Sequence, residues 1–145
     1  MATLQNKTAL VTGASRGIGR ATAFALAGAG ARVLVHYGRS TQDAASLVAG
    51  IRSNGGCADA IRADLGTPDG ATLLAREVRS IIGERLDVVV SNAGISKAAT
   101  IKDHSTIRNR NTRAAYARAC WQFFDWCGDP GVGSFRDLIF LRQYS

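Results

Sequence analysis

A glycine-rich segment near the N-terminus carries the residues with the clearest chemical use in this sequence. It reads Thr-Gly-Ala-Ser-Arg-Gly-Ile-Gly over residues 12–19 and follows a short apolar run. Gly13 permits a tight turn, Gly17 lets a diphosphate approach the backbone, and Gly19 lets a helix pack closely. The N–H groups that begin a helix attract phosphate. We therefore predict a dinucleotide site with these candidate cofactor-binding residues: Gly13, Ser15, Arg16, Gly17, Ile18 and Gly19.

The elements that must position this turn alternate between strand-like and helix-like patterns. Apolar runs at 8–11, 32–36, 58–63 and 86–90 predict four strands. Apolar residues recur at intervals of three and four between these runs, which predicts three helices. Strands that alternate with helices of this length form a parallel sheet with right-handed crossovers. We expect an α/β fold, a Rossmann-type doubly wound parallel sheet with strand order 3-2-1-4.

Local signals indicate where these helices begin and end. Ser40 to Asp43 has the spacing of a capping box, which predicts the start of the second helix. Thr67 and Pro68 match an N-cap followed by proline at the first helical position, which predicts the start of the third. Gly28 and Gly30 are expected to end the first helix.

Three motifs at the ends of predicted strands resemble the short-chain dehydrogenase/reductase family, in particular its 3-oxoacyl-[acyl-carrier-protein] reductases. The glycines at 13, 17 and 19 have the family's Gly-x-x-x-Gly-x-Gly spacing. Asn92-Ala93-Gly94 matches a second signature, and Asp64-Leu65 matches the usual contact to the adenine ring. The resemblance covers about residues 5–105. It implies an NAD(P) cofactor lying across the carboxyl ends of the strands, with these further binding residues: Asp64, Leu65, Asn92, Ala93 and Gly94.

The end of the second predicted strand favours NADP over NAD. Enzymes that prefer NAD commonly place an acidic side chain there to bind the ribose hydroxyls. This sequence has His-Tyr-Gly-Arg-Ser over residues 36–40, without an acid. Arg39 and the Ser40 hydroxyl are expected to hold the 2′-phosphate, with Arg16 as a second cation. The alternative for Arg39 is an ordinary solvated surface arginine.

The residues that would perform hydride transfer have no counterpart in this sequence. The resemblance implies an asparagine, a serine and a Tyr-x-x-x-Lys pair beyond the Asn-Ala-Gly turn, with the tyrosine as general acid or base. Tyr116 is followed four residues later by Cys120, Tyr144 has only Ser145 after it, and no lysine follows Lys102. We assign no catalytic residue. We expect a sheet truncated after its fourth strand and a chain that is catalytically incompetent as it stands.

The last third of the chain differs in composition from the rest. Eight of the ten aromatic residues lie in residues 96–145, and we predict a boundary between an NAD(P)-binding half-domain at 1–104 and a helical tail at 105–145. Residues 105–127 resemble the start of the core-binding region of tyrosine recombinases. This leaves three interpretations of the tail: a composite reading frame, an amphipathic helix that covers the sheet, or a gene remnant without activity.

A DNA-interacting fragment is the alternative function. It depends on an arginine series in the tail that would meet phosphates: Arg108, Arg110, Arg113 and Arg118. Because the complete recombinase site is absent, nucleic acid is not the partner that we expect. The expected partners are the dinucleotide and, through the open edge of the fourth strand, a second copy of the chain.

Composition and charge exclude several classes of protein and of binding partner. Hydrophobic residues make up 46% and charged residues 20% of the 145 residues, as in globular proteins. The net charge of +7 is scattered and by itself indicates no partner. Three cysteines and two histidines form no metal-ligand pattern, so no metal site is predicted. Because neither a signal peptide nor a membrane-spanning run is found, we expect a cytoplasmic protein without a membrane partner.

Overall fold

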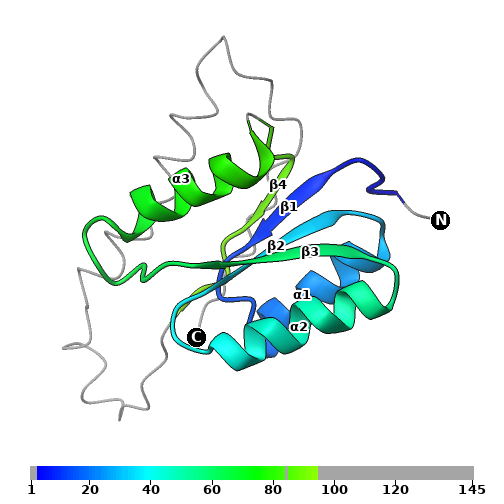
Figure 1. The fold of residues 1–145 in the computed structure, drawn as a ribbon, viewed down its shortest axis with the longest axis horizontal. Coiled ribbons are helices and arrows are strands. Elements are labelled where there is room, and N and C mark those ends of the chain that lie inside the picture. The colour runs from blue at the N-terminus through cyan, green and yellow to red at the C-terminus, as the bar shows by residue number, and fades with distance from the viewer. Residues whose placement is uncertain (1–2, 84, 95–145) are drawn as a thin grey trace, which may run out of the picture.

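Strands and helices alternate along residues 3–83 and 85–94, the part of the chain that the computed structural model describes (Figure 1). In chain order the elements are β1 (Thr8–Val11), α1 (Gly17–Gly28), β2 (Arg32–Tyr37), α2 (Thr41–Ser53), β3 (Cys57–Arg62), α3 (Gly70–Ile82) and β4 (Val88–Val90). All strand pairs are parallel, and the order across the sheet is β3-β2-β1-β4. This confirms the predicted Rossmann-type doubly wound sheet.

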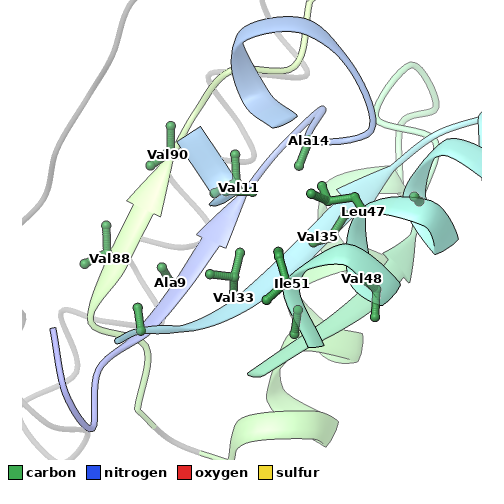
Figure 2. Packing of buried hydrophobic residues seen from close by; sticks show 14 residues of the cluster. Ala9, Val11, Ala14, Val33, Val35, Leu47, Val48, Ile51, Val88 and Val90 are labelled. Carbon is green, nitrogen blue, oxygen red and sulfur yellow. The ribbon is translucent and has the colours of Figure 1, made fainter. Parts of the chain in front are cut away.

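Helices cover both faces of the sheet, with α1 and α2 on one face and α3 on the other (Figure 1). Successive residues of β2 divide between the two cores, as the period of two along a strand requires. Val33 and Val35 pack with Leu47 of α2 on the first face (Figure 2). Leu34 packs with Leu74 of α3 on the second. Burial on both faces explains why β1 and β2 read as continuous apolar runs.

The second helix begins where the sequence predicted, but without the predicted capping box. Ser40 precedes α2, but its side chain makes no capping hydrogen bond, and only its carbonyl accepts the Ala44 N–H, at 3.1 Å. The Asp43 carboxylate, which would complete the capping box, faces Arg16 instead, at 3.6 Å. The predicted capping box therefore does not form, because Asp43 contacts Arg16 in the turn before α1.

The third helix begins at Gly70 and not directly after Thr67. The Thr67 hydroxyl donates to the carbonyl of Asp64 at 2.9 Å, and the Thr67 N–H reaches the same oxygen at 3.2 Å. The Asp64 carboxylate in turn accepts the Gly66 N–H at 2.9 Å. These bonds close a turn over residues 64–67, so the threonine completes this turn and does not cap the helix.

The amino ends of β1 and β4 are joined by the carboxylate of Asp87. Its Oδ2 accepts the Thr8 N–H at 2.9 Å, while the Asp87 N–H donates to the Thr8 carbonyl at 3.0 Å. Lys7 Nζ at 3.1 Å and Arg85 Nη2 at 2.8 Å contact its Oδ1. β4 consequently starts at Val88 and not at Leu86 as predicted. The Thr8 N–H bonds to the Asp87 side chain where a strand pair would use a backbone carbonyl.

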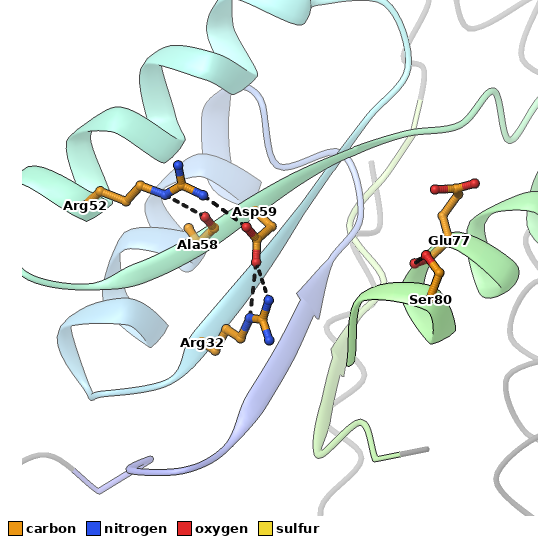
Figure 3. Close-up of polar contacts among 6 residues, drawn as sticks. All are labelled: Arg32, Arg52, Ala58, Asp59, Glu77 and Ser80. Atoms are coloured by element: carbon orange, nitrogen blue, oxygen red, sulfur yellow. Dashed lines mark hydrogen bonds and ion pairs between the residues drawn. The ribbon is translucent and has the colours of Figure 1, made fainter. Parts of the chain in front are cut away.

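A second set of ion pairs lies at the amino end of β2 (Figure 3). Asp59 of β3 accepts from Arg32 Nη2 of β2 at 2.7 Å and from Arg52 Nη2 of α2 at 3.0 Å. Arg52 Nε also donates to the carbonyl of Ala58 at 3.0 Å. These partly exposed pairs each contribute only about 0–1 kcal/mol. They fix the β2–β3 pairing at the end opposite to the glycine turn.

The two edges of the described sheet are β3 and β4. β4 pairs with β1 on one side, and no other described strand lies beside it. Val88 and Val90 are nevertheless only 5% and 3% exposed, because they point into the core. Self-association through this edge stays a prediction. Among residues 3–83 and 85–94, no helix is long and apolar enough to cross a membrane.

Replacement of Asp87 by asparagine is expected to cost about 1–3 kcal/mol of unfolding free energy at pH 7, because a mostly buried acceptor of several hydrogen bonds loses its charge. Burial alone would raise the pKa of Asp87. The bonds from Thr8, Arg85 and Lys7 and the charge of Arg85 outweigh burial and hold this pKa below 3.8. A carboxyl group with a lowered folded pKa stabilises the fold above pH 3.8, and this contribution is lost as the pH falls through the folded value.

Chemical denaturation of both proteins at pH 7 and pH 3 measures this difference. The difference in unfolding free energy between wild type and Asp87→Asn should be smaller at pH 3 than at pH 7. Asp69→Asn is the matched control, because the Asp69 side chain makes no capping bond to α3. Its change should stay within about 0.5 kcal/mol. An equal effect of the two substitutions would contradict the assigned role of Asp87.

Candidate functional site

The turn between β1 and α1 has an inner side that is packed against another segment. Gly13 has a φ of +63°, a conformation that favours glycine, and a Cβ there would lie 2.7 Å from the Cα of Ala93. A Cβ on Gly19 would lie against Asn92 Nδ2 and 2.5 Å from the Gly13 carbonyl oxygen. Neither position has room for a side chain. Gly19 lies close to the turn and to Asn92, whereas the sequence predicted close packing of the helix on the sheet.

The outer side of the same turn is open. Gly17 has a φ of +56°, and a Cβ there would meet nothing within 4 Å. Gly17 is also the first residue of α1, whose preceding residue, Arg16, makes no side-chain capping bond. The first turn of α1 contains no acidic residue. Residues 16–18 are thus exposed at a helix N-terminus without a side-chain cap, an arrangement that suits an anion.

Thr12 and Asn92 join the carboxyl ends of β1 and β4. The Thr12 hydroxyl donates to the Val90 carbonyl at 3.3 Å and accepts the N–H groups of Asn92 and Ala93, each at 3.0 Å. The Asn92 side-chain amide donates to the carbonyls of Thr12 and Gly13, both at 3.1 Å. Asn92 was predicted as a cofactor residue, and in the structure its amide nitrogen holds the glycine turn. The role of Thr12 was not predicted.

His36, the next-to-last residue of β2, holds the turn from the other side. Its side chain is almost fully buried, at 2% exposure. Nδ1 accepts the Gly13 N–H at 3.1 Å, and Nε2 donates to the Ala63 carbonyl at 3.0 Å. Burial lowers the pKa of His36 below 6.5, and the bond to Ala63 opposes this only in part. Sequence reasoning considered this residue only as a non-acidic strand end, because a bond between ring and backbone leaves no pattern in the sequence.

The loop after β2 lies between the glycine turn and α2. Arg39 is exposed, and its side chain forms no ion pair with another described residue. Ser40 is partly exposed, and its hydroxyl does not cap α2. Arg16 extends from the turn toward α2, where its Nε lies 3.6 Å from Asp43 Oδ2 with 76% of its side chain exposed. Three groups predicted to bind a 2′-phosphate thus lie on two loops at the same end of the sheet.

The end of β3 contributes Asp64 and Leu65. Asp64 is exposed, and its carboxylate bonds to the Gly66 N–H. The Leu65 side chain is 6% exposed and belongs to the core beside α3. Because all strands are parallel, this loop lies at the same edge of the sheet as the turns after β1, β2 and β4. The structure therefore brings the predicted binding segments to one edge.

Residues named in the tail lie outside the described part of the chain. This applies to Tyr116, Cys120, Tyr144, the arginine series and the boundary between 104 and 105. The predicted helical tail and the DNA-interacting alternative therefore stay predictions, as does the absence of a catalytic residue.

The chain is similar to known proteins over much of its length. A family model described as short chain dehydrogenase matches residues 7–115. The chain is 48% identical over 100 residues to a versicolorin reductase of Emericella nidulans, covering 69% of this chain and 38% of that protein. It is 45% identical over 97 residues to a 3-oxoacyl-[acyl-carrier-protein] reductase of a Synechocystis species, covering 67% of this chain and 39% of that protein.

A solved structure agrees with these matches. A short chain dehydrogenase from Burkholderia cenocepacia in complex with NADP has 39% sequence identity and a TM-score of 0.63, with 79% of this chain and 51% of that chain covered. The chain thus spans well under two thirds of the length of these relatives. The family model also extends to residue 115, past the predicted boundary at 104. The recombinase resemblance of residues 105–127 stays a prediction.

The glycines of the turn are expected to differ in their tolerance of alanine. Gly13→Ala should cost about 3 kcal/mol or more, because left-handed strain adds to a clash with the Ala93 backbone. Gly17→Ala should cost only about 1–2 kcal/mol, because it meets strain without a clash. Gly28→Ala, at an open helical position, should be neutral or stabilise by up to about 1 kcal/mol. Urea denaturation measures all three, and equal losses at Gly13 and Gly17 would show that the inner side is not tightly packed.

Proposed function

Since the chain belongs to the short-chain dehydrogenase/reductase family, we propose that residues 1–104 are the NADP-binding part of an oxidoreductase that transfers hydride to or from a carbonyl-level substrate. The observation that carries the proposal is the two-sided glycine turn. Gly13 and Gly19 are packed against Ala93 and Asn92, whereas Gly17 is open at an uncapped helix N-terminus. A diphosphate needs both properties, because the amides must be held in place and must also be accessible.

The turn would hold the diphosphate through its backbone. Ser15 is partly exposed, and Arg16, Gly17 and Ile18 are exposed at the start of α1. Their N–H groups and the partial positive charge of the helix end would bind the phosphate oxygens. Bound NADPH would supply the hydride. The task of this segment is to orient the dinucleotide and to neutralise its charge.

The cation positions favour NADP over NAD. Arg39 has no ionic partner among the described residues, and the neighbouring Ser40 hydroxyl is not used as a cap. Among the described residues the Arg16 side chain is engaged only by an exposed contact to Asp43 at 3.6 Å, which is worth little in water and can yield to a phosphate. β2 ends without an acid that would repel a 2′-phosphate. The relative from Burkholderia cenocepacia was solved with NADP, which supports the same assignment.

The remaining contacts are proposed for the adenosine and for the far side of the turn. Asp64 is exposed at the end of β3, while Leu65 is buried, so we expect Asp64 to present polar atoms and Leu65 to contribute mainly backbone. Asn92 supports the turn through its amide nitrogen. Ala93 lies against Gly13, and Gly94 leaves exposed backbone beside the diphosphate.

Hydride transfer by the 145-residue chain alone is not part of the proposal. The family resemblance implies that general acid-base catalysis requires a Tyr-x-x-x-Lys pair. No tyrosine of this sequence is followed by lysine at that spacing. We propose that the chain binds the dinucleotide and does not turn it over. The substrate of the family activity is determined by residues that this segment does not supply.

NADPH should bind the purified chain more tightly than NADH, and Arg39→Ala should reduce this preference. Loss of one charge-assisted contact to phosphate costs about 1.5–3 kcal/mol, which corresponds to about a tenfold to hundredfold weaker NADPH affinity with little change for NADH. Fluorescence titration of both cofactors measures this. Arg76→Ala on α3 is the matched control. A parallel loss for NADPH and NADH would contradict a 2′-phosphate contact.

Gly17→Asp should abolish binding of both cofactors, because it places a negative side chain on the open side of the turn. Gly55→Asp provides a close control, since Gly55 also has a positive φ of +78° and nothing within 4 Å, but lies before β3 at the opposite end of the sheet. Calorimetric titration should show normal NADPH binding for Gly55→Asp only. Undiminished binding by Gly17→Asp would remove the diphosphate assignment.

No consumption of NADPH is expected when the chain is mixed with quinones or 3-oxoacyl thioesters. Absorbance of the reduced nicotinamide measures turnover directly. A rate that disappears in Gly17→Asp but persists in Gly55→Asp would show that the chain is catalytically competent and that this part of the proposal is wrong.

A further inference from the structure

The imidazole of His36 is a buried titratable group that the proposed function does not use. It lies at 2% exposure between the turn after β1 and the end of β3. Both of its ring nitrogens bond to backbone groups, with Nδ1 accepting the Gly13 N–H at 3.1 Å and Nε2 contacting the Ala63 carbonyl at 3.0 Å. The His36 carbonyl also accepts the Ala14 N–H at 2.9 Å. One residue thus holds two consecutive amides of the glycine turn.

The two ring contacts allow only one protonation state. A carbonyl oxygen can only accept, so Nε2 carries the proton, and a backbone N–H can only donate, so Nδ1 must be unprotonated. An imidazolium carries a proton on both nitrogens. Protonation would therefore place an N–H of the ring against the N–H of Gly13. The bond that anchors the turn cannot exist when His36 is charged.

The charged groups near His36 do not bond to its ring, so they do not take over its hold on the Gly13 amide. On β2, Tyr37 adjoins it, and directly after β3 the carbonyl partner Ala63 stands between Arg62 and Asp64. The turn carries Arg16 and α2 carries Asp43, which contact each other. Among the described residues no charged side chain bonds to the ring, and the shift of its pKa has two causes, burial and the bond to the Ala63 backbone. The state of His36 thus acts mainly on Gly13.

We propose that His36 is a positioning residue that keeps the Gly13 amide in place for dinucleotide binding, so that protonation of His36 releases the turn and weakens NADP(H) binding. The proposal rests on the proposed function for its ligand. Among the described residues the Gly13 N–H has no other acceptor, because Asn92 bonds to the Gly13 carbonyl and Ala93 only packs against Gly13. Because binding and protonation favour opposite states of the turn, proton and dinucleotide compete.

The direction of the pH effect follows from burial. The pKa of His36 is lower in the folded chain than the ordinary 6.5, so its neutral form stabilises the fold above that pH. As the pH falls below 6.5, the unfolded chain and the released turn take up a proton more readily than the intact turn. NADPH affinity should decrease as the pH falls through the lowered pKa of His36 in the folded chain, by at most about tenfold per pH unit for one proton.

The first experiment uses the full chain without cofactor. NMR titration from pH 7.5 downward follows the ring nitrogens of His36 and the amide of Gly13. We expect the ring to be protonated on Nε2 at pH 7.5, and the Gly13 resonance to shift with the same midpoint as the ring. A ring protonated on Nδ1, a Gly13 amide that does not respond, or global unfolding before either group changes would overturn the positioning role.

The second experiment measures NADPH affinity between pH 5 and pH 7.5 for wild type, His36→Asn and His104→Asn. Asparagine at position 36 retains an acceptor oxygen for Gly13 but does not titrate. His104→Asn removes the other histidine of the chain. The 2′-phosphate itself titrates near pH 6, so the comparison is between variants with the same ligand. The NADPH affinity of His36→Asn should fall less steeply with decreasing pH than that of wild type. The affinity of His104→Asn should fall as steeply as that of wild type.

The outcomes separate the two proposals. Wild type and His36→Asn with the same pH slope would overturn the role of His36 while the proposed function stands. Absence of NADPH binding by the wild type at every pH would overturn the proposed function and the cofactor part of this inference. The NMR titration without cofactor would still decide whether His36 anchors Gly13. If His36→Asn does not fold at pH 7.5, as judged by circular dichroism, that wild-type titration decides the proposal alone.

Discussion

The candidate site depends on hydrogen bonds that hold a glycine turn from behind while its front stays open. Glycine gives the turn its shape, but the same freedom makes it costly to fix, because glycine loses more backbone entropy than any other residue. Thr12 and Asn92 bind the turn to the end of β4, and His36 binds it to the ends of β2 and β3. Without these contacts the amides would have no single arrangement to offer a diphosphate.

These contacts in turn require the strands to keep their register. Leu10 pairs with Val89 and Val11 with Val90, which puts the end of β1 beside the residues that bond to Thr12. At the opposite end, Asp87 bonds to Thr8 and sets the same register from its first residue. A slip of one residue would turn the apolar side chains of β4 to the wrong face and separate Thr12 from Asn92. Strand pairing and site geometry are therefore one constraint.

Much of this could be predicted from the sequence because the relevant signals are periodic or local. Continuous apolar runs such as Val33 to Val35 predict strands covered on both sides, and the spacing of Gly13, Gly17 and Gly19 predicts the turn. The helix start at Ser40 was predicted correctly, but its capping box does not form because Asp43 contacts Arg16. The helix start at Thr67 was predicted wrongly, because the Thr67 hydroxyl bonds to the Asp64 carbonyl. Bonds of Thr12 and His36 to backbone atoms distant in sequence could not be predicted, since any threonine or histidine can make them.

The distribution of charge explains why such a turn can accept an anion at all. A helix N-terminus carries partial positive charge, and an acid in its first turn would neutralise that charge before any ligand arrived. In α1 no acid is present there, and the carboxylate of Asp43 contacts Arg16 from the next helix. The contact is exposed and weak, so it keeps the arginine near the turn without competing strongly for it. The outer side of the turn is thereby left positive by two independent means, a helix end and an exposed guanidinium, while the bonds that fix its inner side involve only neutral groups.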